Sequence, residues 1–116
     1  MSRPIRVRIL GKHWTLEFAR LYHPTDDVYG TTDGPDVKRK KIKIRKNLRG
    51  EEFLATTVHE CLHAADWHKD EEWVEEVSVD IARVLCRQPV LERILDCPKL
   101  LNSVKHILEK HGFKAK

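Results

Sequence analysis

Hydrophobic and polar residues alternate in three short segments of the N-terminal half of the chain, and a period of two is typical of β-strands. Residues 5–9 and 14–18 have apolar side chains at every second position, and residues 11–12 between them, Gly-Lys, predict the turn of a β-hairpin. Residues 38–46 are strongly basic, and within them Ile42 and Ile44 alternate with lysine or arginine, which predicts a third strand with a cationic outer face. Residues 20–37 are rich in Asp, Gly and Pro and predict a long polar loop, a kind of segment that is often functional.

The C-terminal half has apolar residues at helical spacing instead. A first helix is predicted over about 51–67, and a second begins after Asp70, a good N-cap, and extends over about 71–86. A last helical region covers about 90–111, with Pro98 as a candidate break. The residues expected to be buried are Leu54, Val58, Cys61, Leu62 and Ala65 in the first helix and Val74, Val77, Ile81, Val84 and Leu85 in the second.

The length of 116 residues is that of one domain with one core. We therefore expect a single α+β domain over residues 1–116, with a small, mainly antiparallel sheet of about three strands packed against the helices. Lys and Arg number 22 and Asp and Glu number 18, and the net charge of +4 is too small by itself to indicate nucleic-acid binding. No apolar run reaches the ~18 residues of a membrane span, and no signal peptide is visible. Three cysteines, an odd and small number, disfavour a disulfide framework, so we expect a cytoplasmic protein.

The most informative motif is His59-Glu60-Cys61-Leu62-His63, in which two histidines stand four positions apart inside the first predicted helix. Positions i and i+4 of a helix share a face, so both imidazoles can reach one metal ion. Glu60 lies about 100° around the helix from His59, where it can take a proton from a water on the metal without being a ligand. The motif therefore predicts His59 and His63 as metal ligands and Glu60 as the catalytic base.

A catalytic zinc ion needs a third protein ligand and keeps a fourth position open. The two helices should form an antiparallel hairpin, which places Glu75 and Glu76 at the height of the two histidines. The flank of the second helix that faces the histidines carries Glu71 and Glu75, whereas Glu76 lies on the opposite flank. We therefore predict Glu75 as the third ligand, with Glu76 and Glu71 as alternatives and His68 as a weaker candidate.

Residues 57–64 followed by Glu75 resemble the zincin metallopeptidases, specifically the gluzincin type, whose third ligand is a glutamate on a following helix. The order of hairpin, strand, metal helix and glutamate helix is similar to minimal zincin-like proteins often carried by phages and bacteria. The resemblance covers roughly residues 38–85 and implies a zinc ion, a mostly antiparallel sheet over the metal helix, and hydrolysis of peptide bonds. There are departures from the pattern: the spacing to Glu75 is shorter than in large gluzincins, and Glu76 with Asp80 also has the spacing of a gluzincin ligand and its supporting aspartate.

The cationic segment 38–46 has two interpretations. As an edge strand beside the metal helix it would bind an extended peptide, and its charge would favour acidic substrates or a protein bound to nucleic acid. Alternatively, it is a solubilising face that protects an edge strand from aggregation. The same charge leaves open a second function, a nucleic-acid-associated or structural zinc-binding protein without peptidase activity. Tyr22, His23 and Tyr29, in the loop before this strand, are candidates for stabilising an oxyanion, although a structural role is favoured for each.

Overall fold

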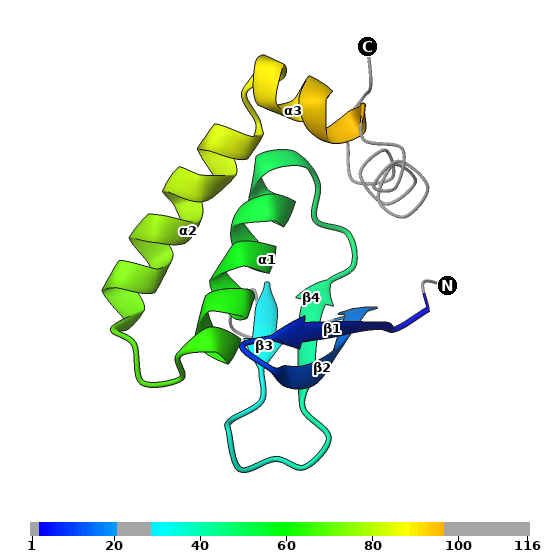
Figure 1. Ribbon diagram of the computed structural model, residues 1–116, viewed down its shortest axis with the longest axis vertical. Helices are drawn as coiled ribbons and strands as arrows, with labels where there is room; N and C mark the ends of the chain where they lie inside the picture. The colour runs from blue at the N-terminus through cyan, green and yellow to red at the C-terminus, as the bar shows by residue number, and fades with distance from the viewer. Residues whose placement is uncertain (1–2, 21–28, 97–116) are drawn as a thin grey trace.

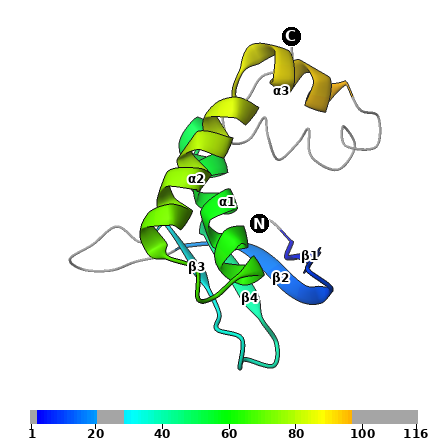
Figure 2. The same cartoon turned by 60° about the vertical axis from the view of Figure 1, so that its left-hand side comes forward.

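The computed structural model describes residues 3–20 and 29–96, which form one four-stranded sheet and three helices (Figure 1). One helix lies against the sheet, and a second helix lies beside the first and away from the strands (Figure 2). The α+β class is thus confirmed. Within these residues, no helix combines the length and apolar character that crossing a membrane requires.

The predicted hairpin is formed by β1 (Ile5–Ile9) and β2 (Lys12–Ala19), which pair antiparallel. Leu10 and Gly11 make the turn, with φ angles of 48° and 78°. Positive φ at both central residues is typical of the tight turns whose twist matches that of the flanking strands. The turn therefore lies one residue earlier than predicted.

Two further strands, β3 (Gly30–Thr32) and β4 (Lys41–Arg45), complete a sheet with the order β1-β2-β4-β3. β4 runs parallel to β2 and antiparallel to β3, so two of the three pairings are antiparallel, as predicted. β3 lies within the segment predicted to be a loop. Because β3 pairs with the far side of β4, the cationic strand is internal, and the prediction that it forms an edge was wrong. β1 and β3 are the edge strands.

Helix α1 (Gly50–Ala65) packs across the inner face of the sheet. It contributes Phe53 to a buried cluster with side chains from β2, β4 and α3, and it also buries Thr56 and Glu60. The predicted stripe of this helix is only partly buried, and two of its members, Leu54 and Cys61, pack against that cluster. The buried members of the cluster are Trp14, Ile42, Ile44, Leu48, Phe53 and Leu91.

Helix α2 (Glu71–Leu85) begins as predicted, since the Asp70 side chain caps it by accepting a hydrogen bond from the main-chain N–H of Trp73 at 3.1 Å. Among the described elements its backbone approaches only α1 and α3. The residues buried against its neighbours are Val74, Ser78 and Ala82. The prediction that Ile81 and Val84 are buried was wrong, since they are 38% and 58% exposed. It assumed that α2 lies on the sheet, whereas α2 lies on the flank of α1.

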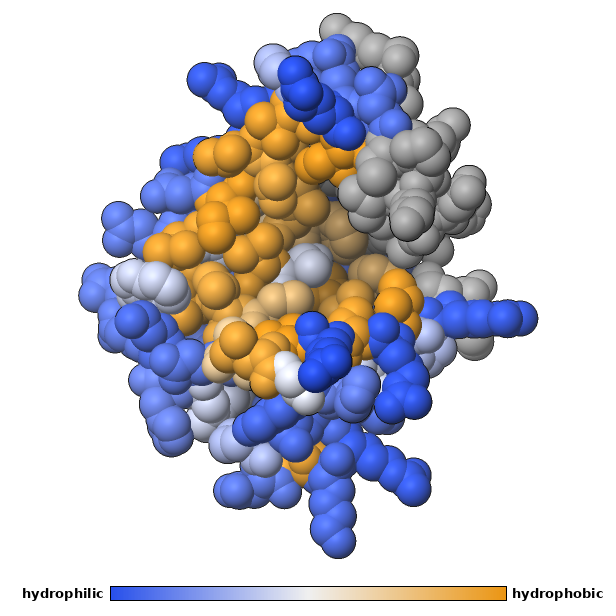
Figure 3. Space-filling model, viewed as in Figure 1, coloured by the Kyte–Doolittle hydropathy of each residue, from blue (hydrophilic) through white to orange (hydrophobic). Residues whose placement is uncertain are grey.

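Helix α3 (Gln88–Leu95) has a proline in its first turn and supplies Leu91 to the core. The remainder of the predicted 90–111 helix, including Pro98, lies outside the described residues. Figure 3 shows apolar side chains gathered over α1, α2 and the β1–β2 hairpin on one face, which is hollowed at its centre.

Candidate metal centre

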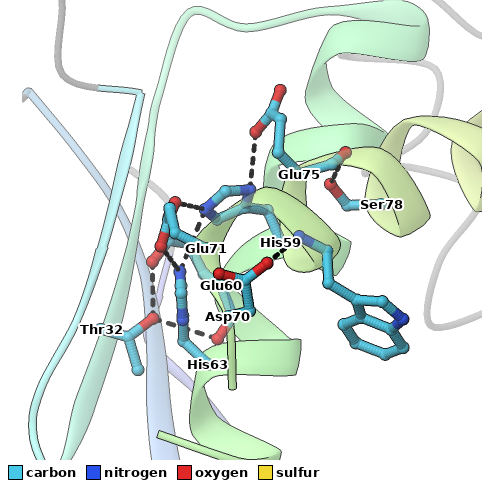
Figure 4. A network of polar contacts seen from close by, with 9 residues as sticks. Thr32, His59, Glu60, His63, Asp70, Glu71, Glu75 and Ser78 are labelled. Atoms are coloured by element: carbon cyan, nitrogen blue, oxygen red, sulfur yellow. Dashed lines mark hydrogen bonds and ion pairs between the residues drawn. The ribbon is translucent and has the colours of Figure 1, made fainter. Parts of the chain in front are cut away.

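His59 and His63 lie one turn apart on α1 and point toward the same position (Figure 4). Their ring centroids are 4.8 Å apart, and their Nε2 atoms are 3.1 Å apart. Each side chain is only 15% exposed. The structure therefore brings together the two nitrogens that the spacing of the motif predicts as ligands.

The first residue of α2 supplies a carboxylate to this pair. Oε1 of Glu71 lies 2.9 Å from Nε2 of His59, and Oε2 of Glu71 lies 2.9 Å from Nε2 of His63. Glu75, one turn further along α2, instead contacts Nδ1 of His59 at 2.9 Å. The geometry thus favours Glu71, one of the two alternatives, over the predicted Glu75 as the third ligand. Glu75 lies where it can orient His59.

Whether a metal fits between the histidines and Glu71 can be judged from which ring nitrogens can carry a proton. A neutral imidazole has one N–H, yet both nitrogens of His59 lie 2.9 Å from a carboxylate oxygen. If the proton is on Nδ1, which faces Glu75, the Nε2 lone pair faces an oxygen of Glu71 and the Nε2 of His63. Converging lone pairs repel unless a metal ion or a proton lies between them, and a metal ion would satisfy all three groups at once, so this donor set fits a metal. The spacing also fits, since two nitrogens at about 2.0–2.1 Å from a tetrahedral zinc lie about 3.3 Å apart.

Glu60 is held by the edge strand rather than by the metal group. Its residue is 7% exposed, and the Thr32 hydroxyl on β3 donates to its Oε1 at 2.6 Å. The same hydroxyl lies 3.0 Å from the main-chain oxygen of Glu60. Gly30 leaves the room that this requires, because a Cβ there would lie 2.8 Å from Cγ of Glu60. Neither Thr32 nor Gly30 was predicted from the sequence, where the brief run Gly-Thr-Thr within a polar segment is the one weak sign of a strand.

A cleft of about 570 Å³ opens beside His59 and Glu60, between α1, α2 and the start of β3. Its wall also carries the carboxyl groups of Glu51, Glu52 and Glu75, and its one lysine or arginine among the described residues is Arg83. That guanidinium is already engaged, since it lies 3.7 Å from Glu51 and 3.9 Å from Asp80. The cleft therefore presents an excess of negative charge beside the metal position.

The other predicted candidates lie apart from the metal group. His63, His59 and Glu71 form the one cluster of His, Cys and acidic side chains in the described residues that is close enough to hold a metal. Glu76 is exposed and Asp80 pairs with Arg83, so neither joins that cluster. His68 follows the end of α1, where its main-chain N–H donates to the Asp66 carboxylate at 3.2 Å.

Of the oxyanion candidates, Tyr29 lies on the wall of the cleft, and the guanidinium of Arg45 lies 5.7 Å from the centre of its ring. Tyr22 and His23 lie outside the described residues. Cys61, within the motif, packs against the core, and burial, reinforced by the charge of Glu60, raises the pKa of its thiol. A thiolate ligand from Cys61 is therefore disfavoured.

Comparison with known proteins adds no assignment, because no protein-family model, no curated protein and no solved structure matches this chain. The likeness to zincins therefore rests on the motif itself. The function has to be argued from the geometry of the site.

Proposed function

We propose that this protein is a zinc-dependent peptidase, in which His59, His63 and Glu71 hold the metal and Glu60 is the catalytic base. The proposal is carried by one observation: two imidazole Nε2 atoms and a carboxylate converge beside a cleft that Glu60 also lines. Two nitrogens and one carboxylate are the protein ligands of one class of catalytic zinc site, which keeps a further position open.

When bound, zinc supplies Lewis acidity, which makes water acidic enough to serve as a nucleophile near neutral pH. The proton transfers belong to Glu60, which accepts the proton of the attacking water and delivers it to the nitrogen of the leaving amine. The Thr32 hydroxyl occupies Oε1 of Glu60, and this leaves Oε2 to carry the proton. Oε2 of Glu75 accepts a hydrogen bond from the Nδ1–H of His59, which leaves the Nε2 lone pair free to face the metal position.

The position of β3 supports an extended peptide as the substrate. β3 is an edge strand, and its Thr32 contacts Glu60, so a peptide that pairs with the edge of β3 that meets no described strand would run past the base. The carboxyl groups of Glu51 and Glu52 in the cleft favour cationic side chains on that peptide. This reverses the acidic preference expected from the sequence, because the basic strand β4 contributes no side chain to the cleft wall.

Free cysteines support the cytoplasmic location that we propose with this activity. Cys61 and Cys86 are not in disulfides, as expected in a reducing compartment. Burial raises the pKa of the Cys86 thiol, as it does for Cys61, and the charge of Glu51 adds to the effect. Both thiols are therefore poorly ionised and slow to oxidise at neutral pH.

Zinc analysis and proteolysis of five variants test the proposed roles. Glu60→Gln should keep stoichiometric zinc and lose cleavage of casein. His63→Ala and Glu71→Gln should lose stoichiometric zinc, whereas Glu75→Gln should bind zinc about 10–100-fold more weakly than wild type. Glu76→Gln is the matched control, since Glu76 is exposed on the same helix and outside the metal group.

Each outcome has a defined meaning. If Glu75→Gln lost zinc and Glu71→Gln retained it, Glu75 rather than Glu71 would be the third ligand. Stoichiometric zinc without cleavage of casein, or of lysine-rich and acidic peptides, would mean that the metal is structural, and a chelator should then lower the melting temperature sharply. Failure of the wild-type protein to bind zinc would overturn the site.

A further inference from the structure

The face of the sheet opposite α1 is strongly cationic. Because Trp14, Ile42 and Ile44 are buried on the helix side, the residues that alternate with them face the other side. The register places Arg6, Thr15 and Lys41 side by side across β1, β2 and β4. Other cationic or ionisable side chains with the same orientation are Arg8, His13, Lys43 and Arg45. The one acidic residue in the four strands is Glu17, which is already paired with Lys41 at 3.2 Å.

A groove of about 350 Å³ lies at the end of this face where β4 begins. Its wall is formed by two segments, residues 38–41 and the residues Arg6, His13, Trp14 and Thr15 of the hairpin. No residue of this wall carries a carboxylate. Within the described part of the chain, no ion pair engages Arg6, Lys38, Arg39 or Lys40.

Trp14 contributes to the wall of the groove, although its side chain packs on the helix side of the sheet, where it also lines a small pocket with His63 and Trp67. Trp14 is 4% exposed, and its indole Nε1 is the one buried side-chain nitrogen or oxygen in the described residues that lacks a hydrogen-bond partner. Because that N–H is buried on the helix side of the sheet, the donors that the groove offers to an oxyanion are its lysine and arginine side chains.

We propose that this groove binds the phosphodiester backbone of a nucleic acid. An acidic peptide fits less well, because peptides are commonly held by main-chain pairing, and β2 and β4 already have a neighbouring strand on each side. A phosphate needs only side-chain donors, and the lysine and arginine side chains here supply them; among the described residues of the groove wall, Lys41 alone is paired with a carboxylate, that of Glu17. The carboxylates of the metal cleft would repel phosphates, so the two ligands would occupy different faces. The inference does not depend on the peptidase activity.

The salt dependence of binding to a fluorescent oligothymidylate of roughly 20 nucleotides tests this inference, because the probe exceeds the ~4–16 nucleotides of common single-strand sites. If the four free cations each neutralise a phosphate, log K should fall with log salt with a slope of about −3. The triple variant Lys38→Ala, Arg39→Ala, Lys40→Ala should lose about two units of that slope and bind more weakly at every salt concentration.

The matched control removes the same charge elsewhere, by Lys69→Ala, Arg87→Ala and Arg93→Ala, at exposed positions outside the groove. This control and Glu60→Gln should both keep the wild-type slope, and circular dichroism should show that every variant is folded. Equal loss of binding in the two triple variants would show a general charge effect and overturn the site. Binding of polyglutamate as tightly as the oligonucleotide would assign the groove to acidic proteins instead, and absence of salt-sensitive binding by the wild type would remove the proposal.

Discussion

Replacing Thr32 by valine tests whether β3 holds the Glu60 carboxylate, because it removes one hydroxyl at nearly constant volume. The hydrogen bond at stake is 2.6 Å long, and its acceptor belongs to a residue that is 7% exposed. Leaving a buried acceptor without its donor costs about 1–3 kcal/mol, and charged groups lie at the upper end. We therefore expect the free energy of unfolding to fall by about 2 kcal/mol. For a chain of this length that corresponds to a fall in melting temperature of roughly 6–10 °C.

A double-mutant cycle separates this contact from a general effect of valine at position 32. Urea unfolding of wild type, Thr32→Val, Glu60→Ala and the double variant should give a coupling energy of about 1–2 kcal/mol between the two residues. Thr32→Ser keeps the hydroxyl and should cost less than about 1 kcal/mol. If Thr32→Val were equally destabilising with and without the Glu60 side chain, the reasoning would be refuted.

The same variant has an expected effect on the proposed activity. Thr32 contacts the base and is not part of the metal group, so Thr32→Val should retain stoichiometric zinc. Its kcat should nevertheless fall by about 10–100-fold, because a small displacement of a catalytic group is costly. Loss of zinc along with kcat would show instead that β3 supports the metal ligands.

Three further substitutions test the packing around the site. Gly30→Ala puts a Cβ 2.8 Å from Cγ of Glu60, so kcat should fall by about 100-fold while zinc analysis shows full occupancy, and an unchanged kcat would contradict the close approach of β3. Asp70→Ala removes the acceptor 3.1 Å from a main-chain N–H in the first turn of α2 and should lower the free energy of unfolding in urea by about 1 kcal/mol, whereas Asp70→Asn should be nearly neutral. Ala82→Leu adds volume at a side chain that is 0% exposed and should cost about 1–3 kcal/mol in the same assay, whereas Val84→Leu, at a position 58% exposed, should change stability little.

The strands and helices that could be predicted are those in which apolar residues recur at the spacing of a strand or of a helix. β1 and β2 alternate over enough residues to show their inner face, and α1 and α2 show both a stripe and, for α2, a capping aspartate. β3 has only three residues, and it is a strand because β4 offers it main-chain partners. Its contribution to the site, through Gly30 and Thr32, was therefore hidden in the sequence.

The partner of a hydrophobic face is harder to predict than the face itself. The stripe through Val77, Ile81 and Val84 predicted that α2 lies on the sheet. In the structure α2 uses the adjacent flank, where Ser78 and Ala82 are 1% and 0% exposed. Small residues allow two helices to approach closely. α2 therefore packs its Ser78 and Ala82 side against α1, and the larger side chains of Ile81 and Val84 stay partly exposed. That arrangement is also what aims the glutamates of α2 at the histidines of α1.

The choice between Glu71 and Glu75 as the third ligand cannot be made from helical periodicity alone. Residues four apart share a helix face, so the sequence indicates the correct flank but leaves the height uncertain by one turn. In the structure both glutamates contact His59, one at each ring nitrogen. If Nδ1 carries the proton and donates to Glu75, the Nε2 lone pair faces Glu71 and His63, an arrangement that a metal ion or a further proton stabilises. In the proposed site, the ligand and its supporting acid, four residues apart, are therefore Glu71 and Glu75 rather than the similarly spaced residues Glu76 and Asp80. Their different nitrogens, and not their exposure or charge, separate the two roles.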